Sequence, residues 1–216
     1  MKYETVIFDL DGTLLDTLDD LTNAVNHALA CCGLPARTHE QVRPLLGYGV
    51  RNLIRCSMPE TADDALFEKV LGEYMPYYAA HCQEKTAPYE GVCALLEKLR
   101  AHGVRAAVVS NKPDGAAKTL CRHHFGDGLA LTVGHFEGVE RKPAPDMVLF
   151  AMEQLHCDAS RTVYVGDTEV DFETAQRAGI DCIGVTWGFR DRTTLEERGF
   201  SPLSDTVGAL SALLLS

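Results

Sequence analysis

The acidic pair that follows the first apolar run of the chain is the feature best suited to chemistry. Val6–Phe8 is typical of a buried parallel strand, and Asp9, Asp11 and Gly12 come directly after it. Residues i and i+2 of an extended chain point the same way, so we expect both carboxylates side by side at an edge where open α/β sheets bind ligands. Adjacent acids need a cation or a shared proton, which predicts a metal and proton transfer. A plain Asp/Gly turn is the alternative.

Two further predicted strand ends carry polar groups. Ser110 and Asn111 follow an apolar strand, where a hydroxyl and the next amides can hold a phosphoryl oxygen, although Ser-Asn also suits a helix cap or a turn. Lys142 stands in a loop with Pro143 and Pro145. The prolines favour a cation fixed beside the cleft, and a solvated lysine is the alternative.

A fourth predicted strand end holds a Gly and two acids. Gly166 permits close backbone approach, and Asp167 stands where it can bind a divalent cation. Asp171, four residues on, falls on the same side of the first helical turn. Acids at this position also cap a helix and offset its dipole, so the structural explanation carries equal weight.

The elements that must position these groups alternate along most of the chain. Strands followed by helices with short links predict a Rossmann-like α/β fold, with a parallel sheet covered on both faces. The predicted strands after the first are Val104–Ser110, Leu129–Val133, Thr162–Val165 and Asp181–Val185, and the predicted helices are Gly91–His102, Asp114–His123, Asp146–Leu155, Glu169–Ala178 and Thr206–Leu215.

An all-helical block interrupts this alternation directly after the first strand. From Asp16 to about Gln83 the apolar spacing is helical, with breaks at residues 33–35, 46–49 and 58–59. We therefore expect an α/β catalytic core formed by residues 1–14 and 88–216, and an inserted helical cap formed by residues 15–87. A cap inserted here is expected to act as a lid over the Asp9/Asp11 edge.

Composition and charge restrict the partners. The net charge of −11 argues against nucleic acid and membrane surfaces, and no stretch approaches a membrane span. The start runs straight into the first strand, so we expect no secretory signal and a cytoplasmic protein. The eight cysteines form no C-x-x-C pair, and we expect reduced thiols, most of them core fillers, and no zinc site.

Taken together and in order, these residues resemble the haloacid dehalogenase-like hydrolase superfamily. The match consists of Asp9-Leu10-Asp11-Gly12-Thr13, Ser110, Lys142 and Gly166-Asp167 with Asp171, and it covers essentially the whole chain. Dehalogenase members lack the second acid of the first motif, so the presence of Asp11 favours a phosphatase.

The resemblance implies a role for each matching position. Asp9 would be the nucleophile and Asp11 the general acid/base. Mg²⁺ would be held by Asp9, the backbone carbonyl of Asp11, and Asp167, with Asp171 orienting that shell. The phosphoryl group would be bound by Gly12, Thr13, Ser110, Asn111 and Lys142. Independently of the family, several acids and a phosphate can share a small cleft only with Mg²⁺ and Lys142 to neutralise them.

A finer similarity points to phosphoglycolate-phosphatase-like members. It depends on residues 46–51 in the helical block and 185–189 after the last core strand. Arg51 is a candidate to bind a substrate carboxylate or second phosphate, with a solvent-facing Arg as the alternative. The expected substrate is a small phosphorylated metabolite such as phosphoglycolate. Pyrophosphate, sugar phosphates and a β-phosphoglucomutase-like reaction remain open.

Two other classes of function are compatible with part of the pattern. A receiver-like signalling module also presents acids, a hydroxyl and a Lys at strand ends, but has neither a large helical insertion nor an acid placed to hydrolyse the phosphorylated Asp. A binding protein without activity is the other. The sequence leaves monomer and homodimer equally open.

Overall fold

The computed structural model describes residues 2–216, which form two compact units. The sheet unit contains the residues up to Asp16 together with Pro88–Ser216, and the helical unit is Thr17–Ala87. The chain passes between them near two short strands, β2 (Leu15–Asp16) and β3 (Ala87–Pro88). The first crossing lies two residues later than the boundary that we expected after residue 14.

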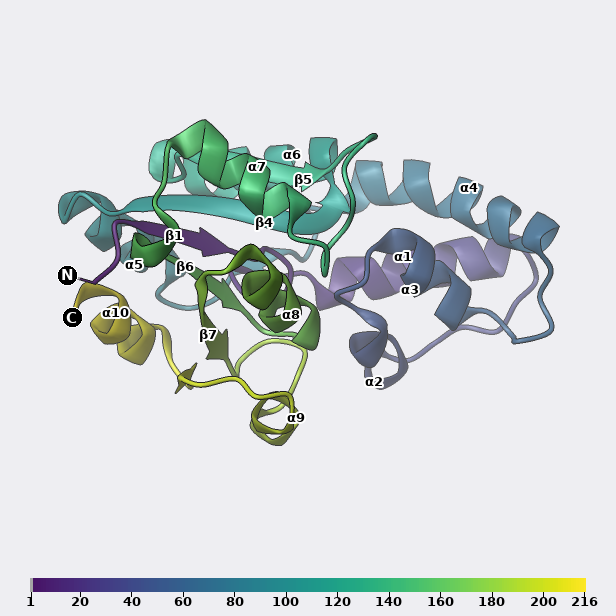
Figure 1. Ribbon diagram of the computed structural model, residues 1–216. Coiled ribbons are helices and arrows are strands. Elements are labelled where there is room, and N and C mark those ends of the chain that lie inside the picture. The colour runs from purple at the N-terminus through teal and green to yellow at the C-terminus, as the bar shows by residue number, and fades with distance from the viewer. Residues whose placement is uncertain (1) are drawn as a thin grey trace. The chain divides into compact units, whose positions relative to one another are not determined.

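A six-stranded sheet with the order β5-β4-β1-β6-β7-β8 forms the centre of the sheet unit, and every neighbouring pair is parallel. This confirms the predicted α/β fold class. Figure 1 shows β1 between β4 and β6, which brings three polar strand ends to the same edge. The strands are β1 (Thr5–Phe8), β4 (Arg105–Pro113), β5 (Leu131–His135), β6 (Thr162–Gly166), β7 (Asp181–Val185) and β8 (Leu203–Ser204).

The helices of the sheet unit follow the predicted alternation closely, and two of them have the predicted bounds. They are α5 (Val92–Ala101), α6 (Asp114–Phe125), α7 (Asp146–Leu155), α8 (Glu169–Ala178), α9 (Arg192–Glu197) and α10 (Val207–Leu215). Helix α9 was not predicted because its sequence, RTTLEE, contains one apolar residue and therefore no periodicity. Asp191 caps its N-terminus, and the Asp191 carboxylate accepts a hydrogen bond from the amide of Thr194.

One face of the sheet packs on α7 and α8 through a continuous apolar cluster. Fully buried side chains of the central strands alternate with others that point to the opposite face, as a doubly covered parallel sheet requires. Members of the cluster are Ile7, Val109, Val133, Met147, Val148, Ala151, Met152, Tyr164, Ala175 and Ile180. The cluster gives the strand ends a rigid base.

The helical unit consists of short and long helices joined at the predicted breaks. They are α1 (Leu18–Cys31), α2 (His39–Val42), α3 (Val50–Ser57) and α4 (Asp64–His81), with a 3₁₀ turn at Arg43–Leu45. Asp20 at the start of α1 accepts hydrogen bonds from the amides of Lys85 and Thr86, which fixes the end of the unit to its beginning.

The expectation that most cysteines fill the core is wrong. Cys82 and Cys121 are buried, but Cys31, Cys56 and Cys93 are exposed. Small residues on outward helix faces need no packing partner, and the apolar neighbours in sequence belong to other faces of the same helices. None of the helices within residues 2–216 has the length and hydropathy needed to cross a membrane.

Candidate active site

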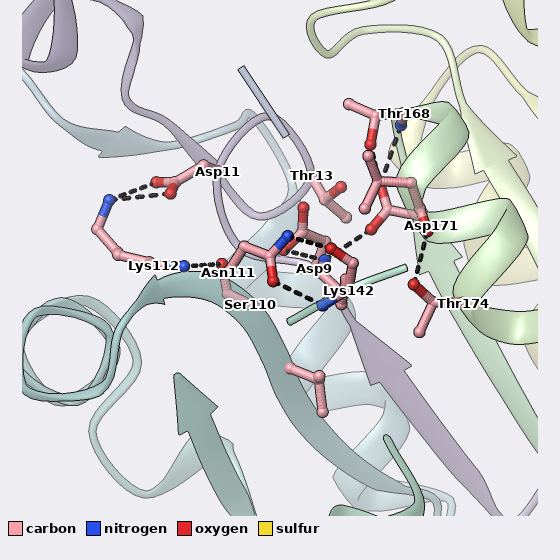
Figure 2. A network of polar contacts seen from close by, with 12 residues as sticks. Asp9, Asp11, Thr13, Ser110, Asn111, Lys112, Lys142, Thr168, Asp171 and Thr174 are labelled. Atoms are coloured by element: carbon pink, nitrogen blue, oxygen red, sulfur yellow. Dashed lines mark hydrogen bonds and ion pairs between the residues drawn. The ribbon is translucent and has the colours of Figure 1, made fainter. Parts of the chain in front are cut away.

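Asp9 continues β1 into the site, whereas Asp11 turns away from it. The amide of Asp9 donates to the carbonyl of Val165, so the backbone pairing with β6 extends one residue past the strand. Figure 2 shows the carboxylate of Asp11 directed at Lys112, apart from Asp9. The expectation that both carboxylates lie side by side is therefore wrong for the side chain of Asp11. Strand β1 ends at Phe8 and the chain bends at Leu10, so the extended geometry ends before Asp11.

Lys142 is a buried cation held by three oxygen atoms. Its Nζ lies 2.7 Å from Asp171 Oδ1 and 2.9 Å from Asp9 Oδ1, and it donates to the Tyr164 hydroxyl at 2.9 Å. The side chain is 1% exposed. The Tyr164 hydroxyl in turn donates to the carbonyl of Val109, so the lysine has one defined position between two acids.

Asp167 lies against the turn after β1, and each of its oxygens accepts a hydrogen bond. Thr13 Oγ1 donates to Oδ1 at 2.7 Å, and the amide of Phe189 donates to Oδ2 at 2.8 Å. A Cβ at Gly12 would lie 2.3 Å from Asp167 Oδ2, so this close approach requires glycine. The resemblance implied phosphate contacts for Gly12 and Thr13; here both fix the position of Asp167.

Both carboxylate oxygens of Asp171 already have polar partners. Oδ1 pairs with Lys142, and Oδ2 accepts hydrogen bonds from the amide and hydroxyl of Thr168 in a capping box at the start of α8. The helix-cap explanation weighed in the sequence is therefore confirmed, and the site role of Asp171 stays a prediction. With no oxygen left over, Asp171 is suited to orient its neighbours.

Ser110 and Asn111 lie inside β4 rather than in a turn after it. The strand runs on to Pro113, with an irregular register between Val109 and Pro113. Ser110 Oγ accepts a hydrogen bond from the amide of Lys112 at 3.3 Å. The carboxamide of Asn111 binds both backbone groups of Lys142, at 2.9 and 2.8 Å, and so ties the two loops together. Phosphate binding by Ser110 and Asn111 stays a prediction.

Sequence reasoning missed Lys112. Its Nζ donates to both oxygens of Asp11, at 2.7 and 2.9 Å, and its side chain is 2% exposed while that of Asp11 is 19% exposed. Its position two residues after Ser110 in the same strand end was the available signal. A pair formed by Arg190 and Glu169 was missed as well; it fixes the loop after β7 to α8 at 2.8 Å and has no local sequence pattern.

Burial makes it costly to ionise the carboxylates of this cluster. Burial, with Asp171 nearby, raises the pKa of Asp9 to about 7 even though Lys142 opposes the shift. Burial also raises the pKa of Asp167 well above its usual value, and the charges of Asp171 and Asp9 add to this. For Lys142, burial lowers the pKa, but Asp171 and Asp9 outweigh it and hold the pKa well above its usual value. With all three carboxylates ionised, Lys142 leaves the cluster with two uncompensated negative charges.

Two groups of side chains in the described part of the chain bring metal-binding atoms within 4.8 Å of one another. One is the fully buried set of Asp9, Asp167 and Asp171. The other is His27, Cys31 and Glu73 on α1 and α4, where Cys31 is exposed. Only the first set consists of oxygen donors alone, as Mg²⁺ prefers.

Arg51 belongs to the helical unit and is engaged there. It lies on α3, pairs with Glu68 at 2.6 Å and stacks on the Phe67 ring at 4.7 Å. Its side chain is 48% exposed, which matches the solvent-facing alternative. A substrate contact for Arg51 stays a prediction.

The fold and the cluster together define a parallel-sheet hydrolase with carboxylate chemistry at the strand ends. Residues 6–185 match the haloacid dehalogenase-like hydrolase family, and the chain belongs to that family. This confirms the resemblance predicted from the sequence. The residues that carried it come from the ends of β1, β4 and β6 and from the loop before α7, which explains why the match extends over so much of the chain.

Relatives agree with the finer similarity. The chain is 33% identical to the phosphoglycolate phosphatase of Pseudomonas putida over 211 residues, covering 95% of this chain and 77% of that protein. It superposes with a TM-score of 0.94 on the crystal structure of a protein from Lactobacillus delbrueckii subsp. bulgaricus, at 36% identity over 99% of each chain. CbbY from Rhodobacter sphaeroides, crystallised with xylulose-(1,5)bisphosphate, shares the fold at 23% identity, with a TM-score of 0.79 over 94% of each chain.

Proposed function

We propose that this protein is a Mg²⁺-dependent phosphatase that hydrolyses a small phosphomonoester, phosphoglycolate or a close analogue, through an aspartyl-phosphate on Asp9. The observation that carries the proposal is the buried cluster in which Asp9 and Asp171 share Lys142, with Asp167 beside them. The names of the curated relatives support the substrate class.

The donor set fits Mg²⁺. Three buried carboxylates face one ammonium group, which leaves a charge that a divalent cation would offset. Asp9 Oδ1 is buried and pairs with Lys142 Nζ at 2.9 Å, and the Asp9 carboxylate lies close enough to Asp167 and Asp171 to share an ion with them. Asp9, the Asp11 carbonyl and Asp167 would hold the ion, with Asp171 behind them. Bound Mg²⁺ would neutralise the phosphate and favour the attack of one anion on another.

The chain's own residues then divide the reaction into two steps. A carboxylate oxygen of Asp9 attacks phosphorus, the bond from phosphorus to the ester oxygen breaks, and Asp11 gives its proton to that oxygen. Water next attacks phosphorus and gives a proton to Asp11, and the bond to Asp9 breaks to release phosphate. Lys142 holds Asp9 in place and stabilises the phosphoryl oxygens during both steps.

Three further parts of the account are proposals of the same kind. The helical unit, predicted from the sequence as residues 15–87, is the cap that selects the substrate. The protein works in the cytoplasm, as a monomer or a homodimer. Sugar-phosphate chemistry is the second candidate, since CbbY was crystallised with a sugar bisphosphate on the same fold.

A steady-state screen tests the proposal. Phosphoglycolate, pyrophosphate and several sugar phosphates are compared by kcat/KM, with Mg²⁺ and with excess chelator. We expect phosphoglycolate to be hydrolysed fastest and all activity to disappear with the chelator. Undiminished rates in chelator would contradict the metal, and an isomerised sugar phosphate without released phosphate would support the mutase.

A further inference from the structure

The loop after β7 contacts the site at three successive residues. Trp187 Nε1 donates to the carbonyl of Thr13 at 3.1 Å, and the amide of Phe189 donates to Asp167 Oδ2 at 2.8 Å. Between them, a Cβ at Gly188 would lie 2.4 Å from both Cβ and Oδ2 of Asp167, so the backbone of the loop lies directly against this side chain. A shift of the loop would therefore move the Asp167 carboxylate.

The buried pair formed by Arg190 and Glu169 holds the same loop. Arg190 Nε donates to Glu169 Oε2 at 2.8 Å and Nη2 donates to Oε1 at 2.9 Å, so the guanidinium binds both carboxylate oxygens. The two side chains are 10% and 11% exposed. Arg190 directly follows Phe189, and Glu169 stands two residues after Asp167. The pair therefore joins, at a second point, the two segments that the hydrogen bond from Phe189 to Asp167 already joins.

Stability alone does not account for an ion pair at this position. Removing two charges from water costs about as much as their attraction returns, and apolar side chains of similar volume often stabilise a protein equally well or better. An apolar contact is non-directional, however, whereas the two parallel bonds between a guanidinium and a carboxylate fix orientation as well as distance. What this pair adds is a defined position for the loop.

Asp167 needs a defined orientation because each of its oxygens already accepts a hydrogen bond. Thr13 Oγ1 donates to Oδ1 and the Phe189 amide donates to Oδ2. Each carboxylate oxygen has a second lone pair, and the direction of that lone pair decides whether Asp167 and Asp9 can bind the same ion. Mg²⁺ requires nearly ideal octahedral geometry, so even a small rotation of the carboxylate lowers its affinity.

Building on the proposed function, we infer that Arg190 and Glu169 are positioning residues for the Mg²⁺ site. Their pair holds the Phe189 amide against Asp167 and so keeps the carboxylate in its ion-binding orientation. They act through this amide and not as ligands. Loss of the pair lets the loop shift, and the affinity for Mg²⁺ falls while the fold is kept.

The experiment measures Mg²⁺ binding without substrate, by calorimetry, together with thermal unfolding of the metal-free protein. R190Q, E169Q and the double variant E169M/R190M are each expected to raise the Kd for Mg²⁺ about tenfold or more, as is usual when a partner of a metal ligand is lost. R190K, which keeps the charge but not the two parallel bonds, should fall between the native protein and R190Q.

The double variant separates positioning from support of the fold. Because its two methionines replace the ion pair with an apolar contact of similar volume, its metal-free unfolding temperature should equal or exceed the native value. Its affinity for Mg²⁺ should nevertheless be reduced. If R190Q does not fold, the double variant carries the test.

R192Q is the matched control. Arg192 stands two residues further along, and its exposed guanidinium pairs with Glu196 and Asp205. Its loss should leave the Kd for Mg²⁺ within about twofold of the native value. Enzyme assays give a second readout, in which the activity that R190Q loses at limiting Mg²⁺ should return to near the native kcat when Mg²⁺ is saturating.

The possible failures are distinguishable. Native affinity for Mg²⁺ in R190Q and in the double variant would overturn the inference and leave the proposed function standing. An equal loss of affinity in R192Q would overturn it as well, since the effect would not depend on the buried pair. A native protein that binds no Mg²⁺ would overturn the proposed metal, and the inference with it.

Discussion

Two clusters of potential metal ligands lie in this chain at similar spacing and in opposite environments. Asp9, Asp167 and Asp171 are fully buried at the sheet edge, whereas His27, Cys31 and Glu73 stand on the outer parts of two helices. In the second cluster Cys31 is exposed while His27 and Glu73 are half-buried, and the Cys31 thiol contacts His27 Nε2 at 3.6 Å.

The difference shows that proximity alone does not make a site. The buried cluster raises the pKa of Asp9 to about 7, a cost that folding must overcome and that a phosphate-handling enzyme can use. The second cluster is open to water at Cys31 and partly open at His27 and Glu73, and water solvates charges that are not buried. Like charges that are buried together at a cost in stability therefore indicate a functional site at this edge of the sheet.

Removal of the nucleophile should give the largest difference in kcat between the two clusters. D9N is expected to lower kcat by about 10⁴-fold or more while the fold is kept, because the amide cannot form the acyl phosphate. E73Q, the same kind of change in the exposed cluster, should leave kcat within about twofold. Steady-state phosphate release measures both. More than about one per cent of native activity in D9N would remove Asp9 from its role.

Removal of the buried cation should act on stability as well as activity. K142M leaves Asp9 and Asp171 without their partner and is expected to cost about 3–5 kcal/mol in the free energy of unfolding. K118M, which removes an exposed pair with Asp114, should cost at most about 1 kcal/mol. Urea unfolding at neutral pH compares the two. Equal losses would mean that burial does not distinguish these pairs.

Metal stabilisation should depend on pH in the buried cluster. The pKa values of Asp9 and Asp167 are raised above the usual 3.8, so the metal-free fold gains stability from them at low pH and loses it as the pH rises through about 7. Mg²⁺ replaces those protons. At a concentration one hundred times its Kd at pH 8, Mg²⁺ should therefore raise the free energy of unfolding by about 2.7 kcal/mol near pH 8. The same concentration should raise it much less near pH 5, where protons compete for the ligands.

Thermal unfolding with and without Mg²⁺ checks this expectation. D167N is the control, because it removes a ligand and should lose most of the Mg²⁺ effect at either pH. An equal gain at both pH values would place the ion elsewhere in the molecule.

The smallest effect is expected in the exposed cluster. H27A and C31S should change neither Mg²⁺-dependent kcat nor the Mg²⁺ shift in unfolding temperature beyond measurement error, because imidazole and thiolate are poor Mg²⁺ ligands. The free energy of unfolding of C31S should move by less than about 0.5 kcal/mol, as is usual for an exposed position. A lost Mg²⁺ response in either variant would make the two clusters equivalent and contradict the account.

Much of the fold was predictable because apolar periodicity is a local signal. The bounds of α7 and α8 and the strands that present Asp9 and Asp167 followed from it. Helix α9 and strand β8 did not, since a six-residue polar helix and a two-residue strand contain too little periodicity. Their positions depend on tertiary contacts.

Side-chain partners in the site were harder to predict than the residues themselves. That Lys142 and Asp171 belong near Asp9 followed from strand order, but the choice of Lys112 by Asp11 depends on an irregular strand end and a turn. The link from Arg190 to Glu169 joins two loops that no local pattern relates. Pairing across loops is set by three-dimensional packing and not by spacing in the sequence.

Covalent capture of the intermediate tests the central claim most directly. Enzyme mixed with substrate carrying a radiolabelled phosphoryl group is quenched in acid within milliseconds, and a parallel sample is reduced with borohydride before peptide mass spectrometry. The account predicts label on the peptide containing Asp9 and conversion of Asp9 to homoserine on reduction. Rapid release of labelled phosphate with no label on the protein, or label on a different residue, would contradict it.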